Sequence, residues 1–75
     1  MAIDERRGMD ISNIEKIILK LLREKPKIDK DDLLRNVAFQ YGEKTGESMS
    51  SLDYNIAIKT VSKKTKKSRL LNYTI

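Results

Sequence analysis

The chain contains no cysteine and no histidine, and these two absences exclude much catalytic and metal-binding chemistry. There is no disulfide framework, thiolate zinc site, cysteine nucleophile, imidazole base or histidine-bound metal. The longest apolar run, Ile17–Leu19, is far shorter than a membrane span, and the polar N-terminus is unlike a secretory signal. With 75 residues there is room for one small domain. We expect a cytoplasmic, non-enzymatic binding module with no cofactor, metal, small-molecule substrate or membrane association.

Acidic residues are missing from the last third of the chain. Residues 1–53 carry ten cations and eleven acids, whereas residues 54–75 carry six cations and no acid, which produces the net charge of +5 of this basic protein. Such a segment releases condensed counterions when it meets phosphate groups. A solvated helix end is the simpler alternative, because the helix dipole favours lysine there. The contrast between the two parts of the chain favours a polyanion partner.

The first predicted helix begins at Ser12, where Ser12 and Glu15 match a capping box. Apolar residues then recur with helical spacing along one face until Pro26 ends the helix; they are Ile14, Ile17, Ile18, Leu21 and Leu22. Residues 1–10 show no periodicity and contain Gly8. We therefore divide the chain into a flexible N-terminal arm over residues 1–10 and one domain over residues 11–75.

A second helix is predicted over Asp29–Tyr41. Asp29 is placed to cap it, and Ile28 and Leu33 occupy the positions of a hydrophobic staple. Gly42 is suited to the left-handed residue that ends a helix, so residues 42–47 are expected to form a turn.

Residues 48–64 fit two structures. Leu52, Tyr54, Ile56 and Ile58 alternate as in a strand, whereas Tyr54, Ala57, Ile58 and Val61 have helical spacing. We favour a helix capped by Ser48 or Ser50, since residues 63–68 contain no residue typical of a tight hairpin turn. The alternative is a β-hairpin over residues 52–75 with a basic tip.

The C-terminal residues show an alternating pattern as well. Leu71, Tyr73 and Ile75 alternate with polar residues, which predicts a short strand that pairs with the segment around Lys27 and Ile28 or with another subunit. On a helix over residues 48–64, two apolar side chains would point away from the main apolar face. A homodimer interface is therefore expected; its residues are Leu52, Ile56 and Tyr73.

In this order of elements the sequence resembles small archaeal winged-helix DNA-binding proteins, which contain a helix-turn-helix. Ile14–Leu22 matches the first helix, Asp29–Tyr41 the support helix, Ser50–Lys64 the recognition helix, and Ser68–Leu71 the step into the wing. The resemblance covers most of residues 11–75, with a longer turn before the recognition helix and one wing strand in place of two. It implies a mainly α, three-helix winged-helix-like domain with a short C-terminal β-strand as an incomplete wing. A composition rich in lysine, glutamate and isoleucine also fits a thermophile.

The predicted function is double-stranded DNA binding, sequence-specific or architectural, by a small transcription regulator. Asn55 could make the bidentate contact to adenine. The candidate nucleic-acid-binding residues are Ser51, Asn55, Lys59, Ser62, Lys63, Lys64, Lys66, Lys67 and Arg69. One alternative is a protein-interaction module that docks a larger assembly through the third helix and the C-terminal strand. The other is an RNA-binding module built on the basic hairpin.

Overall fold

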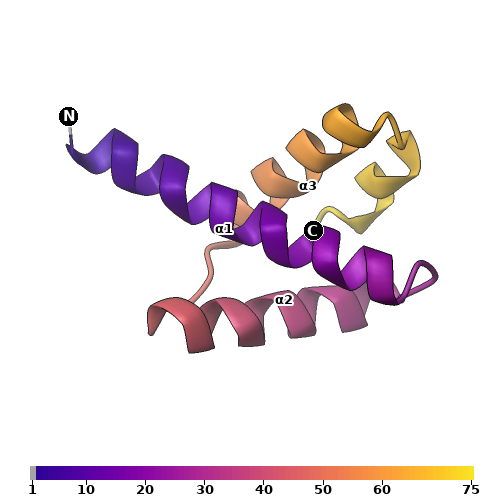
Figure 1. Ribbon diagram of the computed structural model, residues 1–75, viewed down its shortest axis with the longest axis horizontal. Coiled ribbons are helices and arrows are strands. Elements are labelled where there is room, and N and C mark those ends of the chain that lie inside the picture. The colour runs from indigo at the N-terminus through magenta and orange to yellow at the C-terminus, as the bar shows by residue number, and fades with distance from the viewer. Residues whose placement is uncertain (1) are drawn as a thin grey trace.

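Four helical elements make up the computed structural model, which describes the backbone of residues 2–75 and the side chains of residues 10–75. They are α1 (Ala2–Glu24), α2 (Lys30–Thr45), α3 (Ser51–Thr65) and the 3₁₀ helix η1 (Ser68–Tyr73). In Figure 1, α1 runs along the molecule with α2 on one side and α3 and η1 on the other. No β-strand forms between residues 2 and 75, so the mainly α class is confirmed and the predicted C-terminal strand is wrong.

The hydrophobic core lies where these elements meet on α1. Each element supplies side chains that are fully buried, and the helical spacing of these residues puts them on one face. They include Ile14 and Ile18 of α1, Leu33 and Val37 of α2, Tyr54, Ala57, Ile58 and Val61 of α3, and Leu70 of η1. The apolar faces predicted for the first and third helices are therefore confirmed.

Helix α1 begins ten residues earlier than the capping pattern predicts. Ser12 is exposed inside the helix, so it is not an N-cap, and Ile11 packs against the core one turn before Ile14. Burial together with the carboxylate of Asp10 raises the pKa of Tyr41, which places Asp10 beside α2. The predicted mobility of residues 1–10 is not tested by this helical backbone, and the side chains of residues 1–9 lie outside the described part.

Helix α2 begins as predicted and ends one turn later. Asp29 is the N-cap and its carboxylate accepts a hydrogen bond from the Asp31 backbone N–H at 3.3 Å. The left-handed residue at the other end is Gly46 (φ 75°), whose N–H donates to the Gly42 carbonyl. Gly42 itself is helical, so the prediction that it ends the helix is wrong. Both glycines could adopt the left-handed conformation of a C-terminal cap. In the extra turn the Thr45 hydroxyl donates to the Tyr41 carbonyl at 2.8 Å.

Residues 51–65 form a helix, which confirms the favoured interpretation and excludes the hairpin over residues 52–75. Ser50 is the N-cap residue, although its side chain makes no capping hydrogen bond. Both α2 and α3 pack on α1, and their backbones do not approach each other closely.

The C-terminal residues turn back onto the core as η1. Leu70 is fully buried, whereas Leu71 is 45% exposed, the reverse of the burial that a strand with Leu71, Tyr73 and Ile75 facing inward would give. A single strand would leave its backbone groups without a ladder partner, while η1 forms local bonds such as Leu70 N–H to the Lys67 carbonyl at 3.0 Å. The predicted proximity to Ile28 occurs through a side chain: the Tyr73 hydroxyl donates to the Ile28 carbonyl at 2.6 Å.

Candidate nucleic-acid interface

Five cationic side chains are exposed from the second half of α3 to the start of η1, and we call them the basic surface. Lys59 and Lys63 are four residues apart on α3 and therefore share one side of the helix. The others follow at its C-terminal end, so the complete set is Lys59, Lys63, Lys66, Lys67 and Arg69. Residues 54–75 contain no acidic residue, and the one acid of α3, Asp53, lies in its first turn, at the end of the helix away from these cations.

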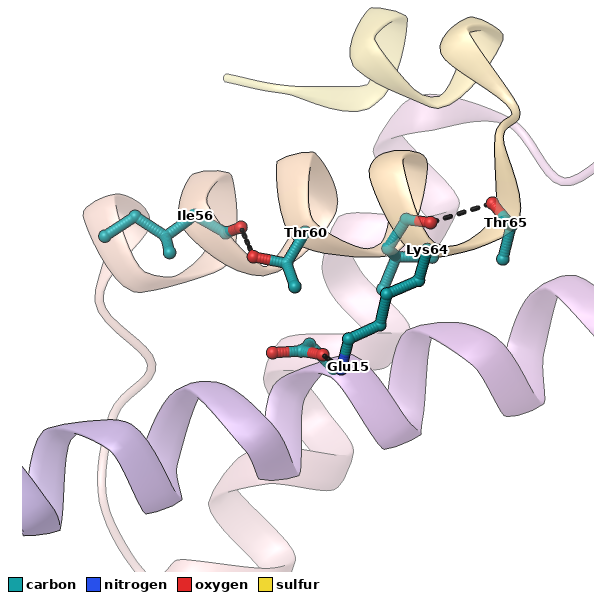
Figure 2. A network of polar contacts seen from close by, with 6 residues as sticks. Glu15, Ile56, Thr60, Lys64 and Thr65 are labelled. Atoms are coloured by element: carbon teal, nitrogen blue, oxygen red, sulfur yellow. Dashed lines mark hydrogen bonds and ion pairs between the residues drawn. The ribbon is translucent and has the colours of Figure 1, made fainter.

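Lys64 is oriented differently from the other predicted cations. Its Nζ lies 2.9 Å from Oε1 of Glu15, which joins α3 to α1 (Figure 2). A DNA phosphate would have to compete with Glu15 for Lys64, so we keep Lys64 outside the basic surface.

Hydroxyl groups on this part of α3 bond within the helix. Figure 2 shows the Thr60 hydroxyl donating to the Ile56 carbonyl at 2.9 Å and the Thr65 hydroxyl donating to the Val61 carbonyl at 2.8 Å. Each bond spans four residues and returns a side chain to its own helix. Direct contacts to an external ligand at this end of α3 thus depend on the cationic side chains.

The end of α3 is a tight turn that positions three of the five cations. Lys66 has a left-handed backbone (φ 57°), its N–H donates to the Ser62 carbonyl, and the Lys67 N–H donates to the same carbonyl at 3.1 Å. The Ser62 hydroxyl in turn donates to the Lys67 carbonyl at 3.1 Å. Ser62 is only 6% exposed, so this predicted contact residue stabilises the turn from inside instead of facing a ligand.

The residues predicted to read bases are only partly available. Ser51 is exposed at the first position of α3. Asn55 is half-buried, and its Oδ1 accepts a hydrogen bond from the Ile75 backbone N–H at 2.7 Å. A bidentate contact to adenine needs both the oxygen and the nitrogen of the amide, so the base would have to share the Asn55 oxygen with the Ile75 N–H.

The predicted dimer residues occupy two different places. Leu52 is 56% exposed and Ile56 is half-buried one turn later, whereas Tyr73 packs against the core with its hydroxyl bonded to Ile28. Ile75 is 57% exposed and its backbone bonds to Asn55, within one turn of Leu52. We call Leu52, Ile56 and Ile75 the apolar patch. The alternating pattern of the last residues predicted that Ile75 belongs to a β-strand, so the sequence did not place it beside Leu52 and Ile56.

Arg23 of α1 also belongs to this side of the molecule, and no sequence signal identified it. It lines a cavity together with Lys67 and Arg69, although more than forty residues separate it from them in the chain. The packing of α3 against both α1 and η1 brings these side chains to one place.

Comparisons with protein-family models, with characterised proteins and with solved structures find no match to this chain. Within the described residues no three acidic side chains gather closely enough to hold a metal ion. None of the described helices combines the length and apolar character needed to cross a bilayer.

Proposed function

We propose that the protein binds double-stranded DNA through the basic surface, as an architectural protein that contacts phosphates. The observation that carries this proposal is the exposure of Lys59, Lys63, Lys66, Lys67 and Arg69 in a segment, residues 54–75, that contains no acidic residue. Residues 1–53 have a net charge of −1, so the positive field is concentrated on one part of the molecule. Phosphate contacts position a protein on DNA without reading its sequence.

Two placements favour architectural over base-specific binding. Ser62 is buried in the turn at the end of α3, and the amide oxygen of Asn55 already accepts a hydrogen bond from residue 75. The side chains that remain exposed are mostly lysines, which act on phosphate as flexible point charges. With no strand among residues 2–75 to form a wing, α3 and the turn after it would make the principal contacts.

A salt series with matched variants tests this proposal. Five phosphate contacts predict that log affinity falls with log salt at a slope of about −4.5, since each contact contributes about −0.9. The variant Lys59→Ala/Lys63→Ala/Lys66→Gly keeps two cations of the basic surface, and its slope should be about −1.8. Glycine is used at position 66 because that residue has a positive φ.

The control removes three lysines from another part of the molecule. Lys16, Lys20 and Lys44 line a separate cavity on α1 and α2, and changing them to alanine also lowers the net charge from +5 to +2. Fluorescence anisotropy with a labelled DNA duplex should give this control the slope of the wild type. Absence of binding at low salt, or the same slope for both triple variants, would refute the proposal. Tighter binding of an RNA duplex of the same sequence would assign the surface to RNA.

We further propose that the protein acts as a homodimer joined through the apolar patch. Leu52 and Ile75 leave apolar area in water that association would cover, at about 25 cal/mol per Å². Leu52 and Ile56 lie on the same side of α3 as Lys59 and Lys63, at successive helical spacings. A two-fold contact there would place two basic surfaces side by side and increase the salt slope.

Light scattering coupled to sizing chromatography measures the oligomeric state. We expect the mass of a dimer for the wild type and of a monomer for Leu52→Asp, with Phe39→Asp as the control, since Phe39 is an exposed apolar residue of α2 (67% exposed). A monomeric wild type would remove the dimer proposal. The exposed patch would then favour the alternative function, docking of α3 onto a larger assembly.

A further inference from the structure

A cavity of about 310 Å³ lies where the C-terminal ends of α1 and α3 meet η1. Part of its wall is apolar: Leu19 and Leu22 are partly exposed there, whereas Val61 and Leu70 are fully buried members of the core. Its volume is near the lower end of the range for ligand-binding pockets in proteins, about 300–1,000 Å³. A ligand of this site is therefore compact and partly apolar.

Three cations from separate segments line the same cavity. Arg23 is in the last turn of α1, Lys67 lies between α3 and η1, and Arg69 is in η1. None of the described lining residues is acidic. Like charges that converge in this way repel one another, and an anion placed between them would convert this repulsion into attraction.

The charge and shape of the site select among anions. An internal phosphodiester of a nucleic acid carries one negative charge, whereas a phosphate monoester carries about −1.5 to −2 at neutral pH. Two guanidinium groups with a lysine suit a doubly charged group with several acceptor oxygens, because arginine bonds phosphate oxygens in pairs. The apolar wall would then cover the face of an unstacked base.

We propose that this cavity binds a nucleotide that carries a terminal phosphate monoester, at the phosphorylated end of a nucleic-acid strand or as a free mononucleotide. The part of this proposal that concerns the end of a strand rests on the proposed DNA binding. Binding of a free mononucleotide does not, because it needs only a site for a dianionic phosphate beside one base. The cavity adjoins the basic surface through Lys67 and Arg69, so a strand that lies along α3 could place its last nucleotide there.

Three DNA ligands of equal length test the strand end: a closed dumbbell without ends, a duplex with hydroxyl-terminated single-stranded overhangs, and the same duplex with phosphorylated overhangs. Wild-type protein should bind the phosphorylated ends about tenfold more tightly than the hydroxyl ends, as expected for charge-assisted hydrogen bonds to one group. Arg23→Ala should abolish this preference. Lys20→Ala, an exposed cation of the same helix outside the cavity, should retain it.

Adenosine monophosphate in a calorimetric titration tests the free nucleotide, with adenosine as the uncharged comparison. Binding of the monophosphate that Arg23→Ala weakens about tenfold and Lys20→Ala leaves unchanged would support the site with a free ligand. Equal affinity for both kinds of overhang, together with no binding of the monophosphate, would overturn the proposal. The dumbbell separates this result from failure of the DNA-binding proposal, because it requires only the basic surface.

Discussion

Leu70 and Leu71 are adjacent in the sequence and lie in opposite surroundings, which makes them a matched pair for mutation. Leu70 is fully buried where η1 meets α3, and Leu71 is 45% exposed. Truncation of a fully buried leucine to alanine costs about 3 kcal/mol, through lost transfer free energy and the cavity that remains. For a half-exposed leucine we expect about 1 kcal/mol or less.

These values are large relative to the stability of so small a domain. A chain of 75 residues has a free energy of unfolding of about 4–11 kcal/mol at 0.05–0.15 kcal/mol per residue. Leu70→Ala should therefore lower Tm by about 12–24 °C, since 1 kcal/mol corresponds to about 4–8 °C in domains of this size. Leu70→Met, which nearly conserves volume, should cost less than about 1.5 kcal/mol.

Urea denaturation followed by circular dichroism measures all three variants. A strand over residues 71–75 would bury Leu71 together with Tyr73 and expose Leu70, so the two leucines would exchange their effects. If Leu71→Ala costs as much as Leu70→Ala or more, the packing of η1 described above is wrong.

Three other residues give independent predictions. Lys66→Gly should raise the free energy of unfolding by about 1 kcal/mol, because Lys66 has a positive φ of 57° that glycine adopts without strain. Gly46→Ala should lower it by about as much, because Gly46 has a φ of 75°, although there is open space for the new methyl group. Urea denaturation measures both variants, and a destabilised Lys66→Gly would contradict the argument from backbone strain. Burial and, to a lesser degree, the neighbouring Tyr73 raise the pKa of Tyr54 to about 12, so ionisation of this tyrosine favours the unfolded chain. The resulting loss of stability is absent below pH 10 and grows as pH rises towards 12. Tyr54→Phe should remove this alkaline loss, about 3 kcal/mol, in denaturation curves recorded between these pH values, and an unchanged pH profile would refute it.

The positions of the three main helices follow from local patterns that act independently of the fold. Ile14, Ile18 and Leu21 recur at helical spacing, and Asp29 is a capping residue next to a staple, so these helices can be predicted one at a time. The helix over residues 51–65 was harder, since alternation and helical spacing overlap at Tyr54 and Ile58. The length of the segment and the lack of turn residues after it favour a helix, which the structure confirms.

The ends of the helices depend on neighbours that a local pattern does not contain. Ser12 and Glu15 match a capping box, yet Ile11 packs against the core and the helix continues through Ser12. Gly42 and Gly46 both suit a left-handed cap, and the contact of Tyr41 with the core extends α2 to the second of them. A cap stabilises a helix by about 0.5–2 kcal/mol, and tertiary packing at these helix ends outweighs that contribution.

What the sequence alone determined about this protein is its charge asymmetry and its helical class, because both depend on the order of residues along the chain. The acid-free segment that carries Lys59, Lys63 and Lys66 is visible in the sequence and is exposed in the structure. The tertiary structure decided which of these polar groups are available: it buries Ser62, joins Lys64 to Glu15, and engages Asn55. It also decided that the last residues form η1 instead of a strand: η1 packs against α3 and α2 and buries Leu70 completely in the core. The cavity lined by Arg23, Lys67 and Arg69 arises from the same packing, because residues distant in sequence become neighbours only when the helices close around one core.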